Sequence, residues 1–336
     1  MRSARKATGN RRQFLITAVG AATLALTRAQ EPSFRPPKHH YIDIHTHLGA
    51  FYWGKEVTAD GLVRWMDDHY IEKACILPLV SPEAAPIVQT TEAALAAYRR
   101  FPDRIIPFCA VDPRSAQTAA STHPPVPGSR YGHISGLEGI IEVLQRYKDA
   151  GARGLGEHKV GLPFDHPVQM MLYEACQKLY LPILFHLDDI RNIDQPGLAH
   201  LRQALLAFPD LPFIGHAAGF WASISADATP KEFASYPRGK PIVPGGALEK
   251  LMDECPNLYA DLSEPGGETA LTRDPDFARE FVIRRADRLL FGTDYLAPGQ
   301  EIPQFAILDR MNLPEEVQYK IYRGNAIRIL KLDLES

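Results

Sequence analysis

Histidine and acidic residues stand at the ends of several short apolar segments of this chain. In YIDIHTHLG, residues 41–49, His45 and His47 are two positions apart, a spacing that puts both imidazoles on one face of a strand but not of a helix. Later segments end in similar groups: Glu157 within GEHK, His186 in FH, His216 in GH and Asp294 in GTD. Imidazole nitrogens and carboxylate oxygens are ligands for Zn²⁺, and also for Mn²⁺ or Fe²⁺. The residue types therefore predict a site for a divalent metal.

A shared site explains these side chains better than separate structural roles. A single histidine at the end of a strand is more often a hydrogen-bonded core residue than a metal ligand. Four histidines and two carboxylates from five segments are harder to explain in that way, because burying so many unpaired polar groups costs several kcal/mol. A divalent cation held among them would offset this cost.

The candidate ligands need a framework that brings distant segments together. We expect eight strands, at residues 41–47, 73–80, 105–111, 152–159, 181–187, 211–217, 257–263 and 289–295. Amphipathic segments with helical periodicity, such as TEAALAAYRRF and LEGIIEVLQRYKDAG, lie between them. This alternation predicts an α/β fold of parallel βαβ units, and eight such units close into a (β/α)8 TIM barrel. The alternative is an open doubly wound sheet, which the lack of a glycine-rich phosphate turn after the first strand disfavours.

Long loops are expected at the end of the barrel where the candidate ligands converge. Residues 48–60, 112–134 and 218–245 follow predicted strands and are rich in proline, glycine and aromatic residues. Loops after strands gather at the C-terminal face of a barrel, where active sites lie. Their aromatic residues either line a pocket or anchor the loops: Phe51, Tyr52, Trp53, Phe220, Trp221, Phe233 and Tyr236.

The pattern of His45-x-His47, His186, His216 and Asp294 resembles the amidohydrolase superfamily. More narrowly, the chain is similar to the amidohydrolase-related branch (amidohydrolase 2), which holds metal-dependent hydrolases and nonoxidative decarboxylases. The closing stretch YRGNAIRILKL resembles the asparagine–alanine signature at the C-terminal end of the family. The resemblance covers about residues 40–332 and implies a metal-dependent TIM barrel.

The resemblance also implies roles for individual residues. His45 and His47 would be metal ligands, and His186 and Asp294 would complete or extend the ligand shell. His216 would bind a second metal or donate a hydrogen bond to the substrate. Glu157 would bridge two ions, or it would form an ion pair with Lys159 inside the barrel. Lys159, if carbamylated, is a further ligand candidate.

Hydrolysis is the activity that this set of residues favours, on a small amide, lactone or ester. One or two divalent ions, with Zn²⁺ preferred, would lower the pKa of bound water to about 7, and Asp294 would accept its proton. The metal and His216 would polarise the attacked carbonyl group. Two alternatives stay open. One is a nonoxidative decarboxylase of a small carboxylate, which basic residues in the pocket such as Lys55, Arg238 and Lys240 would favour. The other is a non-catalytic metal-binding envelope protein.

The first 29 residues differ from the rest of the chain. They hold six positive charges and no acid, and the uncharged stretch FLITAVGAATLAL follows the pair Arg11–Arg12. These features predict a signal peptide of the twin-arginine type, export by the twin-arginine machinery and a periplasmic or secreted protein. Residues 30–336 would then form one metal-dependent TIM-barrel domain.

Charge and hydropathy limit the partners. Without residues 1–29 the chain keeps 31 Lys and Arg against 40 Asp and Glu, a balance that argues against nucleic acid or an anionic membrane. No apolar run reaches the roughly 18 residues needed to span a bilayer. The four cysteines, which stand singly in apolar stretches, are expected to be buried free thiols rather than zinc ligands: Cys75, Cys109, Cys176 and Cys255. The expected partner is a small-molecule substrate.

Overall fold

The computed structural model describes residues 40–52, 54–115 and 136–334, and within this part of the chain all eight predicted strands are present. They are β1 (Tyr41–Thr46), β4 (Ile71–Ile76), β5 (Ile105–Pro107), β6 (Leu155–His158), β7 (Ile183–His186), β8 (Phe213–His216), β9 (Leu258–Asp261) and β10 (Leu289–Leu290). The predicted signal peptide, residues 1–29, lies outside the described residues. No helix in the described part of the chain is both long enough and apolar enough to cross a membrane.

The strands close into a barrel. Parallel pairing runs in the order β1-β4-β5 and, in a second sheet, β10-β9-β8-β7-β6. Parallel bridges from Cys109 to Leu155 and from Thr46 to Tyr295 join the two sheets at both edges. The backbone N–H of Ile44 also donates to the carbonyl of Phe291 at 3.0 Å. This closure confirms the (β/α)8 barrel and rules out the open sheet.

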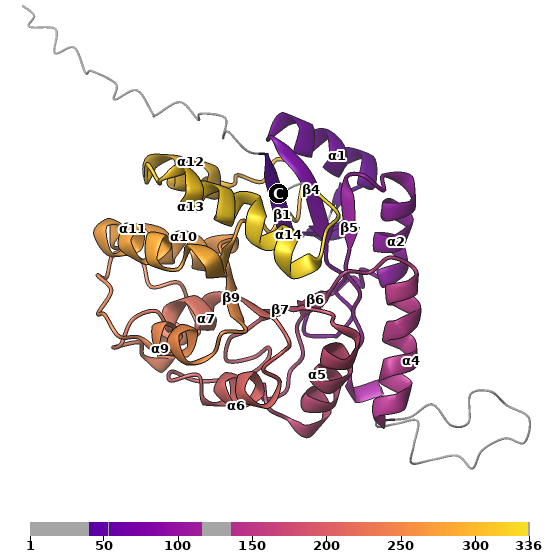
Figure 1. The fold of residues 1–336 in the computed structure, drawn as a ribbon, viewed down its shortest axis with the longest axis horizontal. Coiled ribbons are helices and arrows are strands. Elements are labelled where there is room, and N and C mark those ends of the chain that lie inside the picture. Colours follow the sequence, from indigo (N-terminus) through magenta and orange to yellow (C-terminus); the bar gives the residue numbers. More distant parts are fainter. Residues whose placement is uncertain (1–39, 53, 116–135, 335–336) are drawn as a thin grey trace, which may run out of the picture. The chain divides into compact units, whose positions relative to one another are not determined.

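Helices surround the strands, as Figure 1 shows. α2 illustrates why these segments are helical: the Thr90 side chain caps its first turn by accepting from the backbone N–H of Ala93 at 3.2 Å, and its apolar face is buried. The helices of the described residues are α1 (Ala59–Asp68), α2 (Thr91–Arg100), α4 (Gly136–Asp149), α5 (Pro167–Leu179), α6 (Ala199–Ala207), α7 (Ala218–Ala222), α8 (Pro230–Phe233), α9 (Ala247–Glu254), α10 (Glu264–Thr272), α11 (Pro275–Arg284), α12 (Pro303–Arg310), α13 (Glu315–Tyr319) and α14 (Asn325–Leu330).

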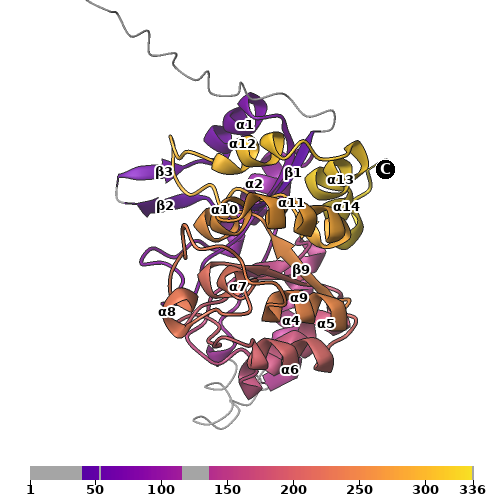
Figure 2. The same cartoon turned by 90° about the vertical axis from the view of Figure 1, so that its left-hand side faces the viewer.

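One end of the barrel is closed and the other carries the loops. Apolar side chains fill the interior, among them Ile42, Ile44, Cys75, Leu184, Ile214 and Leu290. Ala326, Ile329 and Leu330 of α14 pack into the same cluster and close the N-terminal ends of the strands. In Figure 2, α14 lies opposite the hairpin of β2 (Gly49–Tyr52) and β3 (Lys55–Val57). The hairpin replaces the irregular loop expected at residues 48–60 and stands at the open end.

All four cysteines are buried free thiols, as predicted. None of them belongs to a group of potential metal ligands among the described residues.

Asn325, from the predicted asparagine–alanine signature, ties α14 to the barrel. Its side-chain amide donates to the carbonyls of Ala286 at 2.7 Å and Leu289 at 2.8 Å, and the residue is buried. We expect Asn325→Ala to lower the free energy of unfolding by about 2–4 kcal/mol, because two buried carbonyls lose their donor. Urea denaturation would measure this loss. Gln145→Ala on α4, where the side-chain amide makes only an exposed hydrogen bond to Asp149, is the control. Equal stability of the two variants would contradict the assigned role.

Candidate metal centre

The structure brings all six predicted site residues together at the C-terminal ends of the strands. His45 lies in β1 and His47 directly follows it, β7 and β8 end in His186 and His216, and β6 carries Glu157. Asp294 follows β10 and completes the set. Each of them is at most 7% exposed, so the site is built into the barrel interior.

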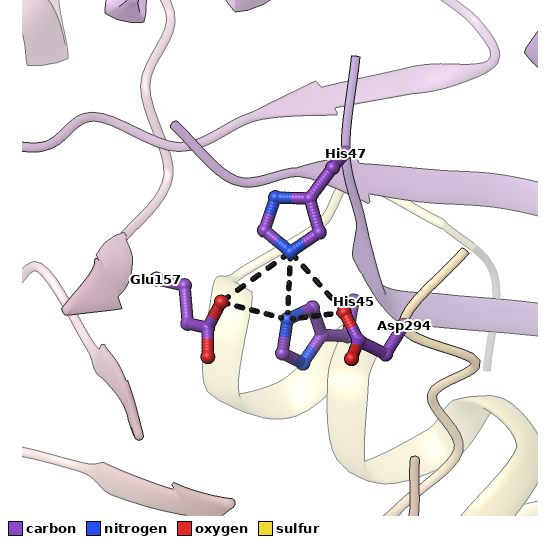
Figure 3. A group of neighbouring side chains, drawn as sticks. All are labelled: His45, His47, Glu157 and Asp294. Carbon is purple, nitrogen blue, oxygen red and sulfur yellow. Dashed lines mark hydrogen bonds and ion pairs between the residues drawn. The ribbon is translucent and has the colours of Figure 1, made fainter. Parts of the chain in front are cut away.

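Four of these side chains form a first group, which Figure 3 shows. The Nε2 atoms of His45 and His47 are 3.1 Å apart. Glu157 Oε2 lies 3.5 Å from His45 Nε2 and 3.4 Å from His47 Nε2. Asp294 Oδ1 lies 3.4 Å and 3.3 Å from the same two nitrogens. Two imidazoles and two carboxylates therefore direct one atom each at a common point.

Hydrogen bonds on the far side of each ring set the proton positions. His45 Nδ1 donates to Asp261 Oδ2 at 2.6 Å, and His47 Nδ1 donates to the carbonyl of Leu77 at 2.8 Å. In the neutral rings, the lone pairs of both Nε2 atoms then face each other and the two carboxylates. Such a cluster of acceptors is stable only with positive charge among them. Burial alone would lower the pKa of His45, but the charges of Asp294 and Glu157 outweigh it and raise this pKa well above its ordinary value.

Glu157 also belongs to a second group, with His186 and His216. Its Oε1 atom lies 3.1 Å from His186 Nδ1 and 3.6 Å from His216 Nε2. The two oxygens of one carboxylate thus face two different sets of histidines. This is the arrangement that a carboxylate bridging two cations requires.

Unpartnered polar atoms show that the residues fit bound metal. Among the described residues, His216 Nε2 and Asp294 Oδ1 are buried and form no hydrogen bond. Leaving a buried acceptor unsatisfied costs about 1–3 kcal/mol. Both atoms are of the kind that binds Zn²⁺ or Mn²⁺, and both point into the two groups.

The alternative interpretation of Glu157, an ion pair inside the barrel, is also present. Lys159 Nζ lies 2.7 Å from Glu157 Oε2, and both side chains are buried. Burial would raise the pKa of Glu157, but the charges of Lys159 and His45 outweigh it and hold that pKa well below its ordinary value. Glu157 is therefore a carboxylate at neutral pH, as a bridging ligand must be.

Asp261, at the end of β9, is not among the site residues predicted from the sequence. Its Oδ2 atom accepts from His45 Nδ1 at 2.6 Å and from Ser263 Oγ at 2.7 Å, and lies 3.2 Å from His216 Nδ1. Asp188 has a similar position, 2.9 Å from His186 Nε2. Both residues orient candidate ligands. The only signal in the sequence was that each stands at or just after the end of a predicted strand.

Asp261→Asn is expected to weaken metal binding about 10- to 100-fold, because replacing a carboxylate that orients a ligand histidine typically has an effect of this size. Competition with a chelator at fixed pH would measure the affinity. Asp103→Asn, at an exposed position, is the matched control. Unchanged affinity in Asp261→Asn would show that the carboxylate does not position His45.

A pocket of about 580 Å³ opens onto the two groups, lined by Lys159, His186 and Asp294 and by loop residues. Of the aromatic candidates, Phe51 and Tyr236 line this pocket. Phe220, Trp221 and Phe233 are buried in the core instead and anchor their loops. The side chains of Tyr52 and Trp53 lie outside the described residues.

The basic residues proposed for carboxylate binding do not line this pocket. Lys55 is exposed. Arg238 pairs with Glu268 at 3.0 Å, and its side chain is 61% exposed. Lys240 pairs with Asp227 at 2.9 Å and with Glu232 at 2.7 Å.

Comparison with known proteins agrees with this geometry. The model of a family described as amidohydrolase matches residues 42–332. An uncharacterized TIM-barrel protein from Bordetella bronchiseptica aligns with a TM-score of 0.56 at 17% identity, over 87% of this chain and 98% of its own. A comparison with curated proteins finds no match.

Two other solved structures share the fold. A probable 2-pyrone-4,6-dicarboxylic acid hydrolase from Acinetobacter baumannii aligns with a TM-score of 0.53 at 14% identity, over 87% of this chain and all (100%) of its own. A dihydroxybenzoic acid decarboxylase from a Polaromonas species, with bound manganese, aligns with a TM-score of 0.52 at 18% identity, over 88% and 98%. At these identities the likenesses support the barrel fold alone.

Proposed function

Because the chain belongs to the amidohydrolase family, we propose that it is a metal-dependent hydrolase of a small amide, lactone or ester. The observation that carries this proposal is the position of Glu157. Its two carboxylate oxygens face two separate sets of histidines, so it is suited to bridge two ions. A two-ion centre is suited to hydrolysis, since it can activate water and polarise a carbonyl group together.

We assign the two groups to two ions, with Zn²⁺ preferred. His45, His47, Glu157 and Asp294 would hold the first ion, and Glu157, His186 and His216 the second. When bound, such ions supply Lewis acidity, which makes water acidic near neutral pH and draws electrons from a carbonyl oxygen.

Asp294 is the proposed general base. Burial would raise its pKa, but His45 and His47 outweigh this effect and hold the pKa below its ordinary range. The residue is therefore ionised. Because its Oδ1 atom is directed at the first group of ligands, the other carboxylate oxygen would accept the proton from water. The same oxygen then passes the proton to the leaving group.

His216 is better suited to be a ligand than a hydrogen-bond donor. Its Nδ1 atom lies 3.1 Å from Ser263 Oγ and 3.2 Å from Asp261 Oδ2, so the ring proton resides there and Nε2 keeps its lone pair. Burial and the neighbouring His45 lower the pKa of His216. The ring is thus neutral and presents an acceptor toward Glu157.

A decarboxylase remains the second candidate because of one contact. If the 2.7 Å ion pair of Lys159 with Glu157 persisted in the metal-loaded enzyme, it would leave room for only one ion. The pocket argues against this candidate, since none of Lys55, Arg238 and Lys240 lines it. A non-catalytic envelope protein is less favoured, because it would have no need for Asp294 in the position of a base.

Metal content and isotope incorporation would test the proposal together. The protein, loaded with Zn²⁺ or Mn²⁺, would be analysed for ions per chain and incubated in H₂¹⁸O with simple esters, lactones, N-acyl amines and 2,6-dihydroxybenzoate. We expect two ions per chain and one ¹⁸O atom in the acid product. One ion per chain with release of CO₂ and no ¹⁸O incorporation would contradict the hydrolase.

A further inference from the structure

The pocket above the metal centre is acidic. Six carboxylate side chains line it, from Asp188, Asp189, Glu264, Glu268, Asp294 and Glu301. Its two cationic side chains already have partners: Lys159 pairs with Glu157 at 2.7 Å and Arg191 pairs with Asp188 at 2.8 Å. The described residues therefore leave no lysine or arginine in the pocket free to receive an anionic substrate.

Three of these carboxylates have no cationic partner among the described residues: Asp189, Glu264 and Glu301. Glu264 is the least exposed of the three, at the start of α10 just after β9, and neutral groups contact it. The hydroxyl of Tyr236 donates to its Oε1 atom, and the backbone N–H of Gly266 donates to Oε2 at 2.9 Å. Burial, followed by the charge of Asp294, raises the pKa of Glu264 to about 8. These are the marks of a carboxylate that lacks a counter-charge.

The cavity itself connects these carboxylates to the reaction centre. It reaches Asp294, which is 7% exposed and whose Oδ1 atom forms no hydrogen bond within the described residues. Apolar side chains also line the pocket, including Phe51, Ile190 and Leu296. A ligand that fits has a polar head at the metals, a hydrocarbon middle and a positive end.

We propose that the substrate carries a cationic nitrogen, an ammonium or guanidinium group, which Glu264 binds with help from Asp189 and Glu301 near the opening. This inference rests on the proposed function, because the metal centre would hold the scissile carbonyl at the other end. A bound cation supplies the counter-charge that Glu264 lacks and favours its ionised form. An anionic tail would instead meet Asp189 and Glu301, which have no cationic partner among the described residues, and be repelled.

Three matched hydroxamates would test the proposal on the metal-loaded enzyme. The three compounds share one metal-binding head and differ only in a neutral, cationic or anionic tail: hexanohydroxamate, 6-aminohexanohydroxamate and the monohydroxamate of adipic acid. Homologues with shorter chains of three to five carbons would allow for a shorter distance between the metal centre and Glu264. Calorimetry would give each dissociation constant. We expect the amine to bind about tenfold tighter than the neutral compound and the carboxylate to bind most weakly.

Two variants test whether Glu264 is the residue that selects the cationic tail. Glu264→Gln keeps the shape of the side chain and is expected to bring the amine-to-neutral affinity ratio close to one, whereas Glu280→Gln, exposed on α11, should keep the ratio. Tightest binding of the carboxylate tail, or an unchanged ratio in Glu264→Gln, would overturn the proposal and leave the hydrolase standing. Failure of all three hydroxamates to bind would instead overturn the metal centre, and this inference with it.

Discussion

Asp294→Asn is expected to reduce the turnover of any hydrolysed substrate by roughly 10²- to 10⁴-fold, the usual contribution of a general base. The amide of asparagine still offers an oxygen toward the metal centre but cannot accept a proton from water at neutral pH. The backbone should not change. Asp294 has a φ of 52°, a left-handed conformation that asparagine also adopts readily, and its N–H donates to the carbonyl of His45 at 2.8 Å.

Steady-state kinetics together with ion counts would separate the two roles of Asp294. Retained ions with lost turnover support the base, whereas loss of ions together with turnover would reduce Asp294 to a metal ligand. Full activity would remove it from the mechanism. Asp276→Asn, at an exposed position on α11, controls for the change of charge.

The position of Asp294 shows why strand boundaries were harder to predict than strands. Alternation of apolar segments with helical ones predicted all eight strands, but residues 289–295 were expected to be one strand and β10 covers only Leu289–Leu290. After that point Phe291 N–H donates to Ile321 instead, at 3.0 Å. Pairing with β9 ends at Leu290, while the residues beyond it still bond to β1 through Phe291, Asp294 and Tyr295. Local periodicity carries no information on this loss of one neighbour.

The direction of the side chains in β1 was also only partly predictable from the sequence. Strict alternation puts Ile44 and His45 on opposite faces, yet Ile44 packs in the barrel interior while His45 points into the metal centre. The pairing of β1 with β4 is irregular between Asp43 and Thr46, which changes the alternation there. The spacing of His45 and His47 was still informative. His45 lies within this irregular part and His47 just beyond it, and both rings reach the same point.

The ligand candidates were predictable because each stands near or shortly after the C-terminal end of a strand, and these ends meet at one rim. Asp261, which orients His45, was not predictable in this way. Asp261 lies 216 positions after His45 in sequence, and only the closed barrel places its carboxylate 2.6 Å from that ring. The excess negative charge of the pocket around Glu264 was likewise not predictable from the sequence. The loops that line this pocket follow several different strands, and only the closed barrel brings them together.

Glu157→Gln is expected to reduce the metal content from two ions per chain to one and turnover by at least about 10²-fold. Glutamine keeps the size of the side chain, but it has one oxygen and no charge, so it cannot serve two cations. His186 and His216 would then hold the second ion without a carboxylate, and the ion would be lost on dialysis. Elemental analysis of dialysed protein, or anomalous scattering at the metal edge, would count the ions.

Lys159→Met separates the bridging role from the ion pair. Methionine keeps the length of the buried chain and removes the amine that lies 2.7 Å from Glu157 Oε2. If Glu157 bridges two ions, this variant keeps both, because the cations take over the charge compensation that Lys159 provides. If Lys159 is itself the ligand, as a carbamate, the order reverses: Lys159→Met loses an ion and Glu157→Gln retains both. A count of two ions in both variants would exclude either residue as the bridge, and the argument from Glu157 on which hydrolysis was proposed would have to be abandoned.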